Sequence, residues 1–590
     1  MGLSWFVEEI TDWRKPKSTV LMGLTRTIMM IIIAIFLYFL ILRELFVKTP
    51  QNFLDALPDG QSLNPLLQTP LMIFHTPIVF LAYGFLVICM ASAMAYLICN
   101  DKDWVKLSMP WGRWGWFFLT LGIGIGGLWA YVVLGWGGYW AWDPVETSSL
   151  LPWILLTAFL HAQLMFKRKK HYKFAAPALG IFTFVLVIFA TFTTRAGGIW
   201  LSVHAFGQAD IETGAIDRFF EIVTGNDVIL GYFILMIGLS IIGAILLIWA
   251  LIKSGGSEEK EVGSSKGSVL EDLINDKNLM FLTLILLTIT TIVTLLLLIL
   301  AINGTNRNQF DTKVGFFAMI GVLVLVACLA WKYIGRKVIL GLFSIYGIIG
   351  FVLGMDLFIE NVAIPMQIII WITIPLLILA VGASLLMIIK SINTRSLRGS
   401  VNGIAPHVVH LGVIFIMIGF VASNFMVTEK NITLLLNGPA EKVGDYELRL
   451  VGSRLSSDHV FVEVEISQNG KVIGSAEPGL VVIEGQVRNE ISVKGSVAED
   501  LYLVFNDYSK AGDTVTSVDL EVKILPLMSL LWLGMWLLAI GILMRLVVDY
   551  TRPKKKMEGR VERRARMRGA EEKSLEYYED LIEKELEEID

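Results

Sequence analysis

The stretch Trp136-Gly137-Gly138-Tyr139-Trp140-Ala141-Trp142-Asp143-Pro144-Val145-Glu146, followed by Pro152-Trp153, lies between two long apolar runs at 113–134 and 147–166. Each run is long enough to cross a bilayer as a helix, for which about 20 apolar residues are needed. Isolated Trp residues beside such runs are ordinary anchors at a membrane surface. Aromatic residues spaced by glycines and closed by an Asp-Pro pair predict instead a flat apolar platform with a few fixed polar groups. A porphyrin is the leading candidate ligand.

The composition indicates a polytopic membrane protein. The chain has 590 residues, of which 55% are hydrophobic and 17% are charged. A net charge of −4 with no basic stripe gives no sign of a nucleic-acid partner. Cys89, Cys99 and Cys328 form no CxxC pair, which argues against thiol–disulfide exchange and against a zinc ribbon.

The apolar runs predict an all-α polytopic fold of about twelve transmembrane helices, and the first run is too long for a cleaved signal peptide. Lys and Arg cluster in alternate connections, so the positive-inside rule places both termini in the cytoplasm. The spans are expected near 20–46, 71–99, 113–134, 147–166, 174–194, 228–252, 278–302, 314–334, 337–357, 366–390, 405–427 and 525–548.

A small extracytoplasmic β-domain is expected before the last helix. Apolar and polar residues alternate from His459 to Ile466, and Asn469-Gly470 is typical of a hairpin turn. The domains are therefore predicted as a membrane helical domain with an outer Trp-rich site, a β-sandwich or partial barrel, the last helix, and a charged cytoplasmic tail. Their boundaries are 1–427, 428–524, 525–550 and 551–590.

Four of the seven histidines form two pairs in this topology. We call His75 and His204, which fall on the side of the Trp-rich stretch, the outer pair. We call His161 and His410, each about five residues from the inner end of its span, the inner pair. Haem iron with two axial histidines needs one imidazole from each side of the ring, and each pair can supply that.

Other interpretations of the histidines remain open. An intramembrane histidine can simply hydrogen-bond a neighbouring helix, although ionisable residues in a membrane are functional candidates by default. His407 lies one turn before His410 and is a rival ligand. His171 belongs to a basic cytoplasmic loop, and His459 is expected on the surface of the β-domain.

The Trp-rich stretch resembles the tryptophan-rich signature of the haem-handling proteins of cytochrome c biogenesis. Flanking segments narrow the resemblance to the CcmF-type cytochrome c haem lyase family, including its NrfE relatives. The likeness runs from about residue 20 to residue 550, and the flanking segments are 63–68 with His75, 195–197 leading to 202–206, 410–412 and 498–502.

The resemblance implies roles for the two pairs. His75 and His204 would be axial ligands of the haem that is being attached, and His161 and His410 would ligate a resident haem b that keeps the transferred iron reduced. The platform for the substrate haem would be formed by Trp136, Gly138, Tyr139, Trp140, Trp142, Asp143, Glu146, Trp153 and Arg195.

The implied reaction is thioether formation between haem vinyl groups and the CxxCH thiols of apocytochrome c, on the outer face of a prokaryotic cytoplasmic membrane. It requires no nucleophile from the lyase. The implied partners are a haem chaperone, apocytochrome c, and thiol-reducing or apocytochrome-binding maturation subunits. The family usually has further helices before the equivalent of residue 20, so a separate subunit is expected to supply them if this is not a reduced form.

Three polar residues of the platform have a structural alternative. Asp143 and Glu146 could contact the haem periphery or a partner, but Asp143 before Pro144 could equally cap the fourth helix. Arg195 could pair with a haem propionate or serve as an interfacial anchor.

The main rival function is a transporter that exports haem or another amphiphile. Against it, intramembrane charges are scarce and no internal repeat is visible. A haem-copper oxidase subunit would need more membrane histidines, and a scaffold of a maturation complex would need none.

Overall fold

The computed structural model describes residues 19–42, 48, 50–56, 65–134, 137–169, 171–200, 202, 204, 214–254, 274–303, 307–355, 366–392, 396–483, 486–512 and 514–550. The predicted charged tail, 551–590, lies outside the described residues, and so does Trp136.

Twelve long helices make up the membrane part of the described chain. They are α2 (Thr19–Leu42), α4 (Pro70–Cys99), α5 (Trp104–Trp129), α6 (Pro144–Lys169), α7 (Ala175–Arg195), α9 (Asp227–Lys253), α11 (Asp276–Leu300), α12 (Arg307–Ile334), α13 (Arg336–Met355), α14 (Met366–Ile392), α15 (Leu397–Phe425) and α16 (Met528–Tyr550). Short helices α3 (Gln51–Ala56), η2 (Pro65–Leu67), η3 (Ala130–Leu134), α8 (Ala215–Thr224) and η4 (Ala301–Asn303) lie in the connections.

The predicted fold class is confirmed. Eleven helices within the described chain are long and apolar enough to cross a membrane, and α13 adds a twelfth apolar helix of 20 residues. Three predicted starts were wrong, and one of them is that of α12, which begins at Arg307 and not near 314. Helix α5 begins at Trp104 and not near 113, and α15 begins at Leu397 and not near 405. Polar and charged residues in the first turns, such as Lys106 of α5 and Arg398 of α15, lowered the local hydropathy without interrupting the helix.

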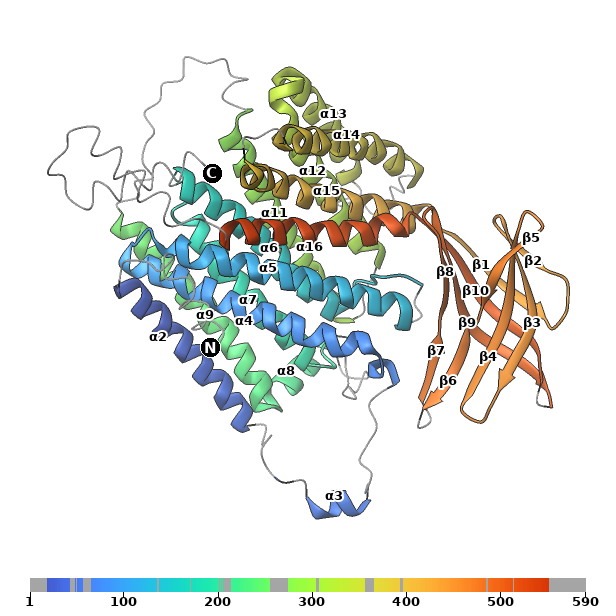
Figure 1. Cartoon of the computed structure of the whole chain (residues 1–590). Coiled ribbons are helices and arrows are strands. Elements are labelled where there is room, and N and C mark those ends of the chain that lie inside the picture. Colours follow the sequence, from blue (N-terminus) through green and yellow to red (C-terminus); the bar gives the residue numbers. More distant parts are fainter. Residues whose placement is uncertain are drawn as a thin grey trace.

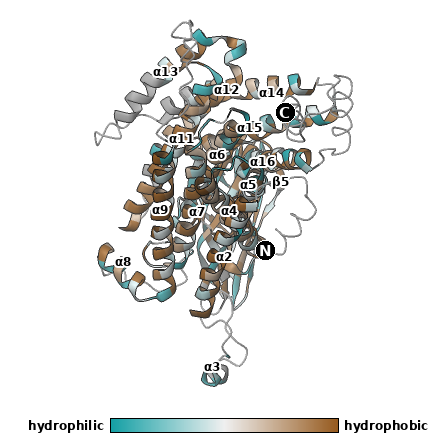
Figure 2. Ribbon diagram, turned by 90° about the vertical axis from the view of Figure 1, so that its left-hand side faces the viewer, coloured by the Kyte–Doolittle hydropathy of each residue, from teal (hydrophilic) through white to brown (hydrophobic). Residues whose placement is uncertain are grey.

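The helices run side by side, and the β-domain lies at one end of them (Figure 1). Helices α4 to α7 pack against one another, with α2 and α9 beside α4 and α7, while α11 joins this group through α6. Helices α12, α14 and α15 form a second group, and α16 lies between α15 and α5. Apolar residues dominate along the helices, as the brown colour of α9, α7 and α4 shows in Figure 2.

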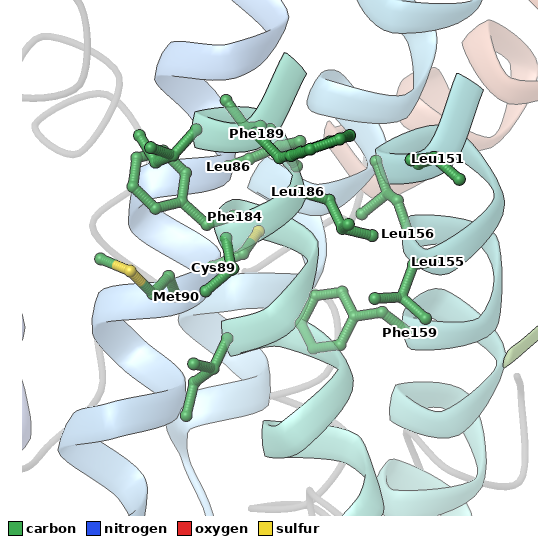
Figure 3. Packing of buried hydrophobic residues seen from close by; sticks show 14 of the residues in the cluster. Leu86, Cys89, Met90, Leu151, Leu155, Leu156, Phe159, Phe184, Leu186 and Phe189 are labelled. Carbon is green, nitrogen blue, oxygen red and sulfur yellow. The ribbon is translucent and has the colours of Figure 1, made fainter. Parts of the chain in front are cut away.

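The core of the first group is formed where α4, α6 and α7 meet. Leu86 and Cys89 of α4, Leu156 and Phe159 of α6, and Phe184 of α7 are each at most 1% exposed and point toward one another (Figure 3). Dispersion contacts in such close packing hold helices together in lipid, where there is little hydrophobic driving force. This rigid core carries the chain segments that bear three of the four paired histidines.

Helices α15 and α16 approach each other closely through glycine. A Cβ atom on Gly412 would lie 2.8 Å from the Gly534 carbonyl oxygen and 2.9 Å from the Leu538 nitrogen. Gly534 faces Gly412 in the same way, with 2.6 Å to its carbonyl oxygen. Small residues at such a crossing let two helix backbones touch. The contact fixes α15, and with it His410, against the rest of the bundle.

The β-domain consists of two antiparallel sheets. One has the strand order β1-β10-β9-β8 and the other β2-β3-β4-β6-β7, with β5 paired to β4. The strands are β1 (Thr428–Leu435), β2 (Glu441–Val443), β3 (Tyr446–Leu455), β4 (His459–Gln468), β5 (Lys471–Ala476), β6 (Gly479–Ile483), β7 (Gln486–Glu490), β8 (Ser492–Gly495), β9 (Glu499–Ala511) and β10 (Thr514–Pro526).

Alternating residues from both sheets bury a shared apolar core, which includes Leu448, Val464, Phe505 and Leu520 at 0% exposure. The β4–β5 hairpin turns at Asn469 and Gly470, whose φ angles are 51° and 73°, as the Asn-Gly pair predicted.

Candidate functional site

The β-domain contacts the start of the Trp-rich stretch. Gly137 has a φ of 77°, and a Cβ atom there would lie 2.4 Å from Nζ of Lys523 on β10. Glycine therefore meets two needs, a left-handed backbone and close approach of another chain segment. Lys523 in turn forms ion pairs with Glu429 at 3.2 Å and Glu521 at 3.0 Å.

Two tyrosines and an aspartate tie the end of α5 to strand β9. The Tyr502 hydroxyl donates to the Tyr131 carbonyl oxygen at 2.9 Å, and the Tyr131 hydroxyl donates to Oδ2 of Asp500 at 2.8 Å. Tyr131 and Tyr502 are 3% and 0% exposed. Burial raises the pKa of the Asp500 carboxyl above its usual value, although the hydrogen bond from Tyr131 lowers it in part. The β-domain is thus docked on the segment that leads into the Trp-rich stretch.

Trp142 adopts a backbone conformation that is rare for a bulky residue. Its φ is 56°, and it is only 5% exposed. Its ring stacks on Phe310 of α12 at 5.2 Å, and its indole N–H donates to Oδ1 of Asp311 at 2.7 Å. These contacts hold the strained backbone in place. Among the described aromatic residues of the predicted platform, Trp142 is therefore the buried one.

The other described aromatic residues of the platform remain partly exposed. Tyr139 lies edge-on to Trp532 at 6.2 Å, while Trp153 stacks on Trp116 at 5.5 Å and donates to Thr120 at 2.8 Å. The indole N–H of Trp140 is buried and has no hydrogen-bond partner within the described chain. An unpaired buried donor is costly, so this N–H is a candidate contact for a ligand oxygen. Gly138 is also buried.

Asp143 and Glu146 build the start of α6. Oδ2 of Asp143 accepts the Val145 N–H at 3.0 Å, and the Asp143 carbonyl oxygen accepts the Thr147 N–H at 2.8 Å. Oε2 of Glu146 reaches back to the N–H groups of Ala141 and Asp143 at 3.1 and 3.3 Å. This is a reciprocal capping box. Of the two alternatives for Asp143, helix capping is the one visible in its contacts.

The same oxygen of Asp143 also binds the loop after α7. Oδ2 accepts the Ser202 hydroxyl at 2.8 Å and lies 2.9 Å from Nδ1 of His204. Burial raises the pKa of Asp143, but the hydrogen bonds from His204, Ser202 and Val145 lower it by more, so that the net pKa is below the usual value. The carboxylate is therefore ionised at neutral pH, and Nδ1 of His204 is the protonated nitrogen that donates to it.

His75 occupies the second turn of α4, against α5. Its Nδ1 lies 2.9 Å from the Gly122 carbonyl oxygen, so Nδ1 carries the proton and Nε2 is left with a free lone pair. A Cβ atom on Gly126 would lie 2.8 Å from Cε1 of His75, so glycine makes room for the ring. Helix α4 starts with Thr69 as N-cap and Pro70 in its first turn. Arg488 of β7 donates to the Gln68 carbonyl oxygen at 3.5 Å, so this start of α4, and with it His75, lies at the end of the bundle that carries the β-domain.

The two residues of the outer pair converge. His75 and His204 are close enough to interact electrostatically, and the Trp129 ring lies 5.3 Å from the His204 ring. In both histidines Nδ1 is held by an acceptor, so Nε2 is the nitrogen available to a metal. A protein acceptor on the second nitrogen is the usual arrangement of a metal-bound histidine.

The inner pair also converges, from α6 and α15. His410 interacts electrostatically with His161, and α6 and α15 are not close-packed neighbours within the described chain. His161 lies 17 residues after Pro144 and His410 lies 15 residues before Phe425, so both are about 22–26 Å from the end nearest the β-domain at 1.5 Å per residue. The depths match when measured from this end. The expected distance of five residues from the inner helix ends was wrong because both helices extend further.

The polar partners of the inner pair differ. Nδ1 of His161 lies 2.8 Å from the Thr157 carbonyl oxygen, which leaves Nε2 free. Nδ1 of His410 and Nδ1 of His407 are buried without a hydrogen-bond partner in the described part of the chain, and the two rings are 6.2 Å apart. An orphaned buried imidazole nitrogen is the kind of group that a ligand satisfies. His407 therefore stays a rival to His410.

Arg195, the remaining predicted residue, is exposed at the end of α7. Sequence reasoning missed Ser202, Asp311 and the buried Arg218, which donates to the Ile302 carbonyl oxygen at 2.9 Å. The Ser202-x-His204 spacing could have indicated the first, because a Ser hydroxyl commonly binds an N–H two residues on. Asp311 is 169 residues from Trp142, and no local pattern marks it.

The chain is similar to known proteins in sequence and in fold. Residues 8–201 match the family of cytochrome C assembly proteins. The CcmF protein of Haemophilus influenzae is 28% identical over 525 residues, which cover 85% of this chain and 76% of that protein. The CcmF protein of Escherichia coli is 36% identical over 203 residues, which cover 34% of this chain and 31% of that protein.

The fold agrees with these relatives. A solved structure titled cytochrome c haem lyase CcmF superposes with a TM-score of 0.57 and 20% identity, over 85% of this chain and 76% of that one. In sequence and in fold, the chain is therefore similar to the CcmF-type proteins of cytochrome c biogenesis. The resemblance inferred from the Trp-rich stretch and its flanking motifs is thereby confirmed. This similarity to CcmF-type proteins makes haem the first ligand to test against both histidine pairs.

Proposed function

We propose that the chain is a haem lyase that attaches haem covalently to the CxxCH motif of apocytochrome c at the β-domain end of the bundle, which faces the outside of the cytoplasmic membrane. The observation that carries the proposal is the chemical state of the outer pair. His75 and His204 converge with both Nδ1 atoms engaged, which leaves two Nε2 atoms for the iron of one haem.

The Trp-rich stretch would hold the ring between these ligands. Tyr139, Trp140 and Trp153 offer aromatic faces and one unpaired indole N–H, and Gly138 allows close approach. Trp142 would shape the platform from behind, since it packs on α12. Trp136 and Arg195 complete the proposed set, with Arg195 as partner of a propionate.

The residues of the inner pair fit a resident haem b. One free Nε2 on His161 and an orphaned, buried imidazole on His410 lie at matching depth on helices that are not close-packed. When bound there, haem b would supply one-electron chemistry that keeps the iron of the substrate haem ferrous. The role of the protein is to hold both imidazoles and to exclude water.

The reaction needs positioning and no protein nucleophile. Each cysteine thiol adds across one vinyl C=C bond, so that sulfur bonds one carbon, the thiol hydrogen goes to the other, and nothing leaves. Cys89, Cys99 and Cys328 lie in membrane helices, away from the outer pair. The lyase would hold the vinyl edge toward the substrate thiols, since orientation alone can supply much of a rate enhancement.

The proposed partners follow from the reaction. A haem chaperone would deliver haem, and maturation subunits that reduce or bind apocytochrome c would present its thiols.

The test is cytochrome formation in cells that depend on this chain. His75→Ala and His204→Ala are each expected to abolish covalent attachment of haem, because each removes one of the two histidines that hold the substrate haem. Covalently attached haem is measured as the haem that stays with the cytochrome after denaturation. His459→Ala is the matched control, because this histidine is 39% exposed on the β-domain and far from the Trp-rich stretch in sequence. Wild-type yield in both outer variants would contradict the proposal.

Supplying haem outside the membrane separates lyase from transporter. A lyase is still required when haem is already outside, so the outer variants stay defective. Full recovery of cytochrome formation in the variants would instead indicate haem export.

A further inference from the structure

The two residues of the outer pair are held by unlike acceptors. His204 donates to a carboxylate that is 4% exposed and that also accepts Ser202 and Val145, while the His204 side chain itself is 14% exposed. The His204 backbone N–H is bound as well, by the Ser202 hydroxyl at 3.0 Å. One buried carboxylate oxygen thus joins the start of α6, the loop after α7 and the imidazole.

His75 has only a neutral acceptor. Its Nδ1 faces the main-chain carbonyl oxygen of Gly122, and the glycine at 126 leaves space beside the ring. A hydrogen bond to an ionised acceptor is roughly twice as strong as one to a neutral acceptor. A carboxylate on the far nitrogen also makes the imidazole a more basic ligand.

We propose that Asp143 is a positioning residue that makes His204 the retained ligand of the outer haem, and that His75 is the ligand that an incoming histidine displaces. The proposal rests on the proposed function. The CxxCH motif carries its own histidine, and the iron of a cytochrome c ends with ligands from the cytochrome, so one lyase histidine must leave first.

The exchange is balanced without any co-reactant. The bond between Nε2 of His75 and iron breaks, a bond from the incoming imidazole nitrogen forms with that nitrogen's lone pair, and the oxidation state of iron does not change. His75 can leave by rotating its side chain away from the Gly122 carbonyl oxygen. Release of His204 would break its bond to a buried carboxylate.

The test uses the full chain with haem and a synthetic peptide in which both cysteines of a CxxCH motif are replaced by serine. In H75G the peptide is expected to restore a six-coordinate low-spin spectrum at a concentration at least about tenfold lower than in H204G, since outer-shell support of a ligand is worth about 10- to 100-fold in affinity. Equal or reversed affinities would overturn the proposal. Free imidazole should restore the low-spin spectrum of both variants at similar concentrations, which would show that both variants still bind haem.

Asp143 is tested by D143N in the H75G protein. The amide can still cap α6 through its oxygen, but it carries no charge. Haem affinity at the outer site is expected to fall about 10- to 100-fold, and the reduction potential of that haem to rise, because a less basic ligand stabilises ferric iron less. A merely structural role would leave the potential unchanged and would overturn the proposal. D103N is the matched control, because Asp103 also lies at a helix start and pairs with Lys106 at 3.0 Å.

Failure of the proposed function would look different. If H75G, H204G and the double variant all keep the wild-type haem spectrum and haem content, the outer pair binds no haem. That result removes the lyase site, and the proposal with it. Bound haem with no difference between the two peptide affinities removes only the order of exchange.

Discussion

The outer and inner histidine pairs are built from the same residue type but with opposite surroundings. At the outer pair, Asp143, Ser202 and the Gly122 carbonyl oxygen hold both imidazoles, and the partly exposed His204 follows a loop. At the inner pair, the imidazoles come from two long helices, and among the described residues His161 hydrogen-bonds only within its own helix, at the Thr157 carbonyl oxygen, while Nδ1 of His410 has no partner. Polar support beside an open end suits a ligand that is exchanged. Enclosure between helices suits one that stays.

The difference also separates two ways of fixing a side chain. Helix packing determines the positions of the inner imidazoles, and the Gly412–Gly534 contact holds α15 against α16. Hydrogen bonds to a capping box set His204. The inner pair should therefore respond to changes in packing, and the outer pair to changes in hydrogen bonding and local space.

The largest effect is expected when one histidine of the inner pair is replaced. His161→Ala or His410→Ala should remove essentially all of the low-spin b-type absorbance of the purified protein, oxidised or dithionite-reduced, because two axial imidazoles are needed. His171→Ala, in the basic loop after α6, is the control and should keep the spectrum. A colourless wild-type protein, even after haem is offered, would refute the inner site, and an unchanged His410→Ala spectrum would transfer its role to His407.

The next effect concerns the outer pair alone. Gly126→Ala places a Cβ atom 2.8 Å from Cε1 and 3.1 Å from Nδ1 of His75, so the ring must shift. We expect affinity for haem at the outer site to fall about 10- to 100-fold, as for other small displacements of reacting groups, with the inner spectrum unchanged. Gly84→Ala on α4, with nothing within 4 Å, is the matched control. Equal titrations for the two variants would show that the position of His75 does not matter.

A packing change should act on the inner pair. Gly412→Ala brings a Cβ atom against backbone atoms of Gly534 and Leu538, which cannot move aside, and should cost about 1–3 kcal/mol of stability. Thermal unfolding in detergent, followed together with the b-type absorbance, measures it. Gly382→Ala on α14 meets nothing within 4 Å and should be neutral or slightly stabilising. A loss of outer haem with an intact inner spectrum would contradict the assignment of packing to the inner pair.

The smallest effect is a pH dependence at the β-domain contact. Burial raises the pKa of Asp500 in the folded protein, so folding favours the neutral carboxyl. The stability that this provides is fully present below the unfolded pKa of about 3.9 and is lost as pH rises through the folded pKa. Asp500→Asn keeps an acceptor for Tyr131 and should raise Tm at pH 7, with the gain vanishing toward pH 4. Asp507→Asn, exposed on the same strand, should show no such trend. A gain that is independent of pH would exclude the ionisation of Asp500 as its cause.

Much of the fold could be predicted from the chain because a bilayer imposes a simple rule on it. A long apolar run must be helical to satisfy its backbone, so α4, α7 and α9 lie close to the predicted spans. The start of α5 could not be predicted by that rule, because hydropathy reports where a helix meets lipid and not where its hydrogen bonds begin.

The sequence by itself determined the class of the protein and the β-domain with its Asn469-Gly470 turn, and it predicted the two histidine pairs. These depend on hydropathy, charge and turn chemistry, which act locally along the chain. Only the tertiary structure decided that one oxygen of Asp143 serves both the α6 cap and His204, and that Trp142 rests on Phe310 and Asp311. Those contacts join residues 61 and 169 positions apart, and such pairings follow from how helices pack and not from any local pattern.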